Sequence, residues 1–351
     1  EKELKARIRY LKGLLRSEAL RLDVVVQETQ DIKERFATPR KTVILTSDKP
    51  GDAIVTEADL VAPEGAQVVA VTTLGVQRSN AKGFSYRVKA GTTSRAVEAH
   101  RLHLRTEPTD AVVLVSSLGK AWWGLVGRLP TSAKFEDLGL DKGEEVVGLG
   151  VLSDSGYLVL GTKKGQVKRI ELDDIKAAAE ATWTAVIGLS GDQDGVHFAG
   201  VGGDGAEVMF VTSARANRFE SNTVKPQATP SARGVAAIKV RPGDRLLGGT
   251  VVADPAAQLG VVVVSKTGYV KRVPLGEFPV QGRGGQGVLV LNQTRATGPV
   301  VAVGIGALNG SVDLIAADGK RQRLDKVPEA NRPNRGEKMV KLSDVAEVRV
   351  L

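Results

Sequence analysis

The chain has 351 residues, a formal net charge of +9 and an isoelectric point near 9.6. It contains no cysteine, which excludes disulfide frameworks and thiol chemistry. No segment approaches the roughly 18 to 20 consecutive apolar residues of a membrane span, and the N-terminus is charged rather than signal-like. We therefore expect a soluble cytoplasmic protein with no membrane partner, whose positive charge favours a polyanion as ligand.

The first part of the chain has a helical pattern that runs from Glu3 to about Phe36. Ser17 interrupts this pattern and can cap a second helix, and Pro39 follows the end of the pattern. One stripe of the first helix is apolar and consists of Leu4, Ile8, Leu11 and Leu15. Residues 1–39 are thus predicted to be the helical end of a coiled-coil arm. Because the chain opens inside a helix without an initiator methionine, we expect it to be a piece of a longer polypeptide.

After Arg40 almost everything reads as strand and turn, starting with a short strand at 42–46. An apolar strand, a tight turn and a returning strand then recur six times. The copies start near Val68, Val112, Leu158, Val208, Val261 and Val312. This spacing of roughly 44 to 53 residues is typical of the blades of a propeller. One helical insertion is predicted between the strands, at 173–181.

Two cations end the returning strand in the clearest copies, as Lys168-Arg169 in the third and Lys271-Arg272 in the fifth. The fourth copy keeps only Arg218, and the sixth keeps Arg323. The second copy has Trp-Trp at 122–123 instead. In a ring of repeats this position would form a continuous basic rim. Solvated charges that protect strand edges are the alternative explanation for any single pair.

Catalytic and metal sites find little support in the sequence. His100 and His103 are three residues apart, so on a strand they would face opposite sides, and His197 stands alone. A propeller enzyme would need carboxylates or histidines that converge on the central channel, and no candidate cluster is visible. We predict no catalytic residue and no metal ligand in this chain.

A resemblance to a known family rests on several segments. Residues 281–287 read Gln-Gly-Arg-Gly-Gly-Gln-Gly and follow the strand and turn at 268–278. This stretch is similar to the glycine-rich box in the C-terminal domain of the A subunits of bacterial type IIA topoisomerases, the family of DNA gyrase and topoisomerase IV. Residues 222–227 and 232–239 resemble another blade of that domain. Residues 36–44 resemble its junction with the coiled coil, and residues 57–60 resemble the acidic turn before its first blade.

The resemblance implies an all-β, six-bladed β-pinwheel over residues 40–351, preceded by two α-helices. It implies a domain that binds and bends duplex DNA without reading its sequence, and it assigns DNA contacts to the box and the recurring cations. The predicted DNA-binding residues are Gln281, Gly282, Arg283, Gly284, Gly285, Gln286, Gly287, Lys271, Arg272, Lys168, Arg169, Arg218, Lys225, Arg233, Arg78, Arg323 and Arg335.

The parent enzyme implied by the resemblance is a homodimer of A subunits with an ATPase B subunit, and it works at the nucleoid. That enzyme uses Mg²⁺ and ATP, and neither site is expected in this chain, which lacks the catalytic tyrosine domain. In gyrases the box sits in the first blade with several cations, whereas residues 78–87 here contain no such motif. The box in the fifth repeat has one cation. This favours relaxation and decatenation of the topoisomerase IV type over negative supercoiling. A propeller-like scaffold for protein partners is the alternative function.

Overall fold

The computed structural model describes residues 1–36, 65–82 and 101–350. Two helices, α1 (Lys2–Arg16) and α2 (Glu18–Phe36), confirm the predicted helical start. They separate at Ser17, whose Oγ accepts a hydrogen bond from the Leu20 backbone amide at 3.3 Å. No residue of either helix is buried, so the apolar stripe of α1 is exposed. None of the helices in the described ranges is long and apolar enough to span a membrane.

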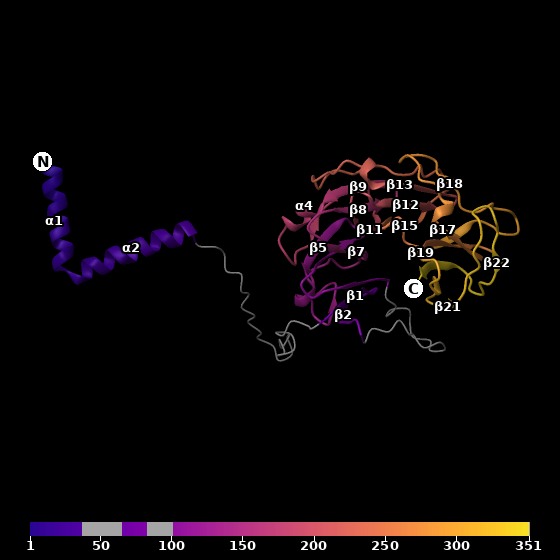
Figure 1. Cartoon of the computed structure of the whole chain (residues 1–351), viewed down its shortest axis with the longest axis horizontal. Helices are drawn as coiled ribbons and strands as arrows, with labels where there is room; N and C mark the ends of the chain where they lie inside the picture. Colours follow the sequence, from indigo (N-terminus) through magenta and orange to yellow (C-terminus); the bar gives the residue numbers. More distant parts are fainter. Residues whose placement is uncertain (37–64, 83–100, 351) are drawn as a thin grey trace. The chain divides into compact units, whose positions relative to one another are not determined.

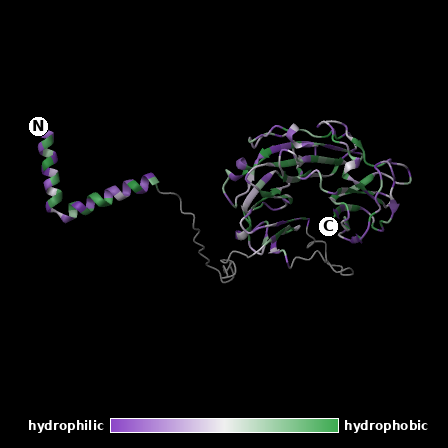
Figure 2. Cartoon of the chain, viewed as in Figure 1, coloured by the Kyte–Doolittle hydropathy of each residue, from purple (hydrophilic) through white to green (hydrophobic). Residues whose placement is uncertain are grey.

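The chain divides into two compact units, Glu1–Val55 and Thr56–Leu351. The predicted strand at 42–46, the resemblance at 57–60 and the predicted boundary between residues 39 and 40 lie outside the described residues. The second unit is almost entirely β-structure. Figure 2 shows hydrophobic residues along its strands and hydrophilic residues on many of the connecting loops.

Six antiparallel hairpins, which start where the six repeats were predicted, form the framework of the described β-structure. They are β1 (Gln67–Val71) with β2 (Gly75–Asn80), β4 (Ala111–Ser116) with β5 (Lys120–Leu125), β8 (Tyr157–Thr162) with β9 (Gln166–Glu171), β12 (Glu207–Thr212) with β13 (Arg215–Glu220), β16 (Leu259–Ser265) with β17 (Tyr269–Pro274), and β20 (Val312–Ala316) with β21 (Arg321–Leu324). The first strands are buried along most of their length, as their apolar runs require.

An inner strand pairs with the first strand of each hairpin. The inner strands are β3 (Leu102–Thr106), β7 (Val146–Leu152), β11 (Val196–Gly202), β15 (Leu246–Val252), β19 (Val300–Ala307) and β23 (Val345–Val350). Neighbouring inner strands approach closely because they contain glycine. A Cβ on Gly148 would lie 2.5 Å from Ala199, and one on Gly304 would lie 2.7 Å from Val348. The blades follow one another around the disc, with β7, β11, β15 and β19 near its middle (Figure 1).

A short outer strand completes each of the first five blades. The outer strands are β6 (Ser132–Lys134), β10 (Thr184–Ala185), β14 (Val235–Ala236), β18 (Val288–Leu289) and β22 (Glu337–Lys338). Each comes from the chain that follows the next hairpin. For example, β14 follows the hairpin of the fourth blade but pairs with β9 of the third, where Val235 faces Val167. This exchange of strands between neighbours defines the six-bladed β-pinwheel that was predicted.

The connections between hairpins and outer strands contain short helices. They are η2 (Val126–Arg128), α4 (Leu172–Lys176), η3 (Ser221–Thr223) and η4 (Leu275–Glu277). The helix predicted at 173–181 is therefore present but shorter, and the chain reaches φ 58° at Ala181. The two apolar residues of α4, Leu172 and Ile175, are buried. Their burial fixes the start of the connection that leads to β10.

Candidate nucleic-acid interface

The basic pair of the third repeat is buried. Lys168 is 0% exposed and Arg169 is 3% exposed. Lys168 Nζ donates hydrogen bonds to the backbone carbonyls of Val186 and Thr229, both at 2.7 Å. Arg169 Nη1 donates to the carbonyl of Val224 at 3.3 Å. These carbonyls lie in the connections that carry outer strands, so the pair holds the exchanged segments in place.

In the fifth repeat Lys271 has the same role, whereas Arg272 binds the end of β19 and the turn that follows it. Lys271 Nζ donates to the carbonyl of Asn334 at 2.7 Å and to two other carbonyls of the same connection. Arg272 Nη1 donates to the carbonyl of Ala307 at 3.2 Å. Burial away from water penalises the charged form and lowers the pKa of both Lys271 and Lys168 to about 8.

The other repeats place different hydrogen-bond donors at these two positions. At the first position, Asn217 Nδ2 donates to the carbonyls of Ala237 at 2.8 Å and Gly282 at 3.2 Å. At the second position, the side chain in each of four repeats donates a hydrogen bond to a backbone carbonyl that lies 51 to 57 residues later in the chain. These contacts are Arg78 to Leu129, Trp123 to Ala178, Arg169 to Val224 and Arg218 to Leu275. A donor at one or both of these positions thus stabilises strand exchange in each of the first five repeats.

The prediction that these pairs form a basic rim is therefore wrong for the buried side chains. A phosphate cannot reach a cation that is enclosed by the protein and already bonded to carbonyls. The excluded residues are Arg78, Lys168, Arg169, Lys271 and Arg272. Two further predicted cations are only partly exposed and are ion-paired, Arg218 with Glu207 and Arg323 with Asp313.

The glycine-rich box occupies a different blade from the one its sequence position indicated. Residues 281–287 follow the fifth hairpin, but they lead into β18, which pairs with β13 of the fourth blade. The amide of Gln281 donates to the carbonyl of Arg218 at 2.7 Å, and that of Gly284 donates to Ala237 at 2.8 Å. The box is thus an edge of blade 4 that also contacts blade 3.

The box glycines serve the backbone path. Gly284 and Gly287 have φ of +76° and +68°, where other residues are strained. A Cβ on Gly287 would lie 2.3 Å from the carbonyl oxygen of Ala216. Residues 281–286 are all exposed. Arg283 extends towards blade 3, and its Nε donates to the carbonyl of Thr223 at 3.2 Å.

Eight exposed cations lie on the outer-strand segments of three adjacent blades, and we call them the basic arc. They are Lys225, Arg233, Lys239 and Arg241 on blade 3, Arg283 on blade 4, and Arg335, Lys338 and Lys341 on blade 5. Among the described residues, none of the eight has a carboxylate within ion-pair distance. The sequence predicted Lys225, Arg233, Arg283 and Arg335 and missed the other four.

One repeated signal in the sequence marks part of this surface. Gly234, Gly287 and Gly336 each precede an outer strand, and each has a positive φ between 68° and 79°. A Cβ on any of them would lie within 2.4 Å of a carbonyl oxygen of the neighbouring hairpin. The residue before this glycine is exposed in each case, as Arg233, Gln286 and Arg335. The glycine before each of these outer strands thus shows that the residue preceding it lies on the surface.

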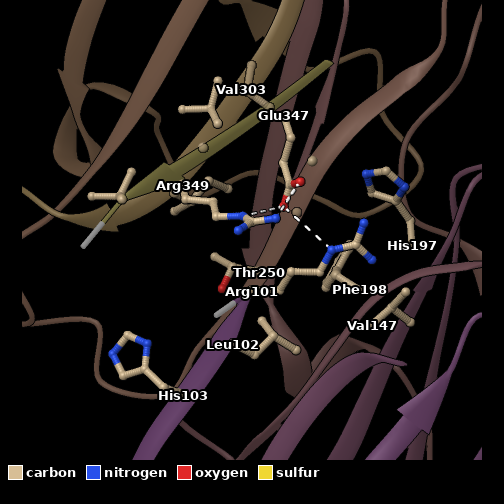
Figure 3. A pocket seen from close by; sticks show the side chains of 16 residues that line it. Arg101, Leu102, His103, Val147, His197, Phe198, Thr250, Val303, Glu347 and Arg349 are labelled. Carbon is tan, nitrogen blue, oxygen red and sulfur yellow. Dashed lines mark hydrogen bonds and ion pairs between the residues drawn. The ribbon is translucent and has the colours of Figure 1, made fainter. Parts of the chain in front are cut away.

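The centre of the disc contains a pocket of about 270 Å³ lined by all six inner strands. Figure 3 shows Glu347 between two guanidinium groups. Arg349 Nε donates to this carboxylate at 2.8 Å, and Arg101 Nε lies 3.8 Å from it. Burial lowers the pKa of His197, which favours the neutral imidazole. One ion pair in the pocket, between Arg101 just before β3 of blade 1 and Glu347 on β23 of blade 6, links these two blades.

Metal-binding groups of three or more His, Cys, Asp or Glu side chains are absent from the parts of the chain that the structure describes. In the central pocket, the single carboxylate is neutralised by Arg101 and Arg349. This arrangement favours a structural role for the pocket.

The fold and the exposed cations define a strand-exchanged β-propeller with a basic edge, and comparisons with known proteins agree. The sequence profile of the "DNA gyrase C-terminal domain, beta-propeller" matches residues 156–179, 218–253, 261–305 and 319–348. The DNA gyrase A protein of Lawsonia intracellularis is 25% identical over 99% of this chain, and that of Mycobacterium tuberculosis is 26% identical over 97%. The chain is therefore similar to the C-terminal β-propeller domain of DNA gyrase A subunits.

Solved structures have the same fold. The C-terminal domain of DNA topoisomerase IV aligns with a TM-score of 0.67 and 20% identity, over 82% of this chain and 94% of that one. The DNA gyrase A C-terminal domain aligns with a TM-score of 0.60 and 22% identity, over 82% of this chain and the whole of that one. The chain spans less than half the length of the curated relatives, 44% and 42% for the two named above.

Proposed function

We propose that this chain binds duplex DNA without sequence preference and bends it over the edge of the disc. The observation that carries the proposal is the basic arc. Eight exposed cations on three adjacent blades face solvent without acidic partners. Phosphates are the ligands that such a surface fits, because bound Lys and Arg release the counterions of DNA.

The rigidity of the disc supports bending rather than simple binding. Bending a 20 to 30 base-pair site by 40 to 90° costs on the order of 1 to 6 kcal/mol, which many phosphate contacts can offset. Strand exchange and buried donor pairs tie each blade to its neighbour, so the edge resists deformation. The exposed backbone of the box adds a surface that a phosphate can approach closely.

For the parent protein we propose a type IIA topoisomerase in which this domain presents a DNA segment for ATP-dependent strand passage. Its partners would be an ATPase B subunit together with another copy of the parent protein, at the bacterial nucleoid. The box on blade 4 contains one cation, Arg283, and we take this as support for relaxation and decatenation over negative supercoiling.

A binding titration tests the first part of this proposal. The affinity for a fluorescent 30 base-pair duplex is measured at several salt concentrations. We expect a slope of log K against log salt steeper than about −4, since each phosphate contact contributes about −0.9. Absence of binding at low salt would contradict DNA binding and favour a protein scaffold.

A ligation experiment tests the second part. Nicked plasmid is sealed in the presence of increasing amounts of the chain, and its linking-number distribution is then resolved. Bending without chiral wrapping leaves the distribution unchanged while binding persists. A progressive positive shift would instead support a gyrase-like role.

A further inference from the structure

The outer-strand segments of blades 1 and 2 have the opposite charge to those of blades 3 to 5. We call residues 132–145 and 180–187 the acidic arc. Its cations are Lys134 and Lys142. Its acidic residues are Glu136, Asp137, Asp141, Glu144, Glu145 and Glu180. The edge of the disc is therefore divided into two stretches of different charge.

Several acids of the acidic arc are held by cations of the same two blades. Lys120 Nζ lies 2.5 Å from Asp141 and 2.6 Å from Glu144. Hydrogen bonds to these two carboxylates raise the pKa of Lys120. Arg128 is ion-paired with Glu180 at 2.9 Å. These cations are thus neutralised within the protein and contribute little net attraction for phosphate.

The register of the strands allows a position-by-position comparison of the two arcs. Val235 of β14, Thr184 of β10 and Ala133 of β6 occupy the same place beside their hairpins. The residue two positions before this place is Arg233 in blade 3. At that position blades 1 and 2 have threonine, Thr131 and Thr182, and both are exposed.

The cations on the described hairpin of blade 6 are ion-paired, so they do not add unpaired positive charge to the basic arc. Arg321 and Arg323 are both ion-paired with Asp313, which is 3% exposed. Lys320 is ion-paired with Asp318 at 2.7 Å. Among the residues that the structure describes, the unpaired cations of the outer-strand segments are therefore concentrated on blades 3 to 5.

We infer that duplex DNA follows only the basic arc and leaves the disc before blade 2. This inference rests on the proposed DNA binding and adds a path to it. A phosphate backbone that continued onto the acidic arc would find its nearby cations paired with carboxylates and would meet Glu136 and Asp137 on blade 1, which repel it. The DNA is then bent over part of the edge and does not encircle the disc.

Exchanging the residue at one register position between the arcs tests this path. Arg233→Thr gives the basic arc the side chain of blade 2, and Thr182→Arg gives blade 2 the side chain of the basic arc. Both residues are exposed, so neither change disturbs the core. Thermal melting of each full-length variant checks that the fold is intact.

We expect Arg233→Thr to reduce the salt slope by about 0.9 and to weaken binding about fivefold at 0.15 M salt. Thr182→Arg is expected to leave both unchanged, because the duplex does not reach this position. A steeper slope and fivefold tighter binding for Thr182→Arg would overturn the inference, as would an unchanged Arg233→Thr. Failure of the unmodified chain to bind duplex would instead overturn the proposed function itself.

Discussion

The basic arc and the acidic arc share one backbone plan and differ in charge. In both, an outer strand is donated by the next repeat and pairs with the same part of a hairpin. The exposed position before the strand is Thr182 in blade 2 and Arg233 in blade 3. The comparison teaches that strand exchange determines where a side chain emerges, while the residue type determines which partner the edge can bind.

A second contrast lies within single blades, between buried and exposed cations. Lys271 is 1% exposed and donates to three carbonyls, whereas Arg335 of the same blade is exposed. Positive charge in the sequence therefore serves two purposes. Buried cations hold exchanged segments, and exposed cations are available to a polyanion.

The strongest way to break the comparison between the arcs is to remove the charge of the basic arc. We expect the combined replacement of Arg233, Lys239, Arg283 and Arg335 by glutamine to weaken duplex binding about a thousandfold at 0.15 M salt, since four phosphate contacts are lost. Fluorescence anisotropy measures the change. The matched control, Glu136→Gln with Asp137→Asn on the acidic arc, should change affinity less than about threefold.

A buried donor sharpens the contrast between structural and binding cations. Lys271→Met leaves carbonyls of residues 331–334 without their donor, and we expect the free energy of unfolding to fall by about 2 kcal/mol. Lys271→Gln should lose less than half as much, because glutamine retains a donor. Chemical denaturation gives both values. The folded protein should keep its salt slope, and a reduced slope would show that Lys271 contacts DNA.

The box provides a smaller, local test. Gly287→Ala forces a Cβ against the Ala216 carbonyl at a positive φ and should cost about 1 to 3 kcal/mol of stability. Gly285→Ala is the control, because the nearest atom to its Cβ would be 3.4 Å away. Thermal melting compares the two variants. Equal melting temperatures would contradict the described path of the box.

The pH dependence of stability tests the buried cations in a further way. The pKa of Lys168 and Lys271 is about 8 in the folded chain, below the ordinary value of 10.5. Between these values the unfolded chain binds more protons, so stability should rise as the pH increases from 8 to 10. Below pH 8 both states are protonated and this contribution is constant. The stability profile of Lys271→Met lacks the contribution of Lys271, so the difference between the profiles of the unmodified chain and this variant isolates that contribution. A difference that does not rise between pH 8 and pH 10 would contradict the lowered pKa of Lys271.

Much of the fold was predictable because the hairpins have strong local signals. Apolar runs such as 261–264 and turn glycines such as Gly268 identify strands and turns without long-range information. The outer strands were not predictable from local pattern, since β14 and β18 have two residues each and no periodicity. Their pairing depends on a hairpin more than 60 residues earlier in the chain.

The candidate site was only partly predictable for the same reason. Lys168 and Arg233 look alike in the sequence as cations beside a strand. Only the two connections that carry β10 and β14 show that Lys168 is enclosed, because its acceptors Val186 and Thr229 come from these later segments. Arg233 lies outside that enclosure. Burial by exchanged strands is a long-range property that a local motif does not contain.

Cleavage from a tethered reagent tests the division of the edge most directly. The chain has no cysteine, so Ser231→Cys beside Arg233 of the basic arc and Thr131→Cys directly before the acidic arc each create a single attachment point at an exposed residue. An iron chelate attached there cuts nearby DNA when it is activated. The account predicts strong cleavage of a bound duplex from position 231 and background cleavage from position 131. Equal cleavage from both positions would contradict it.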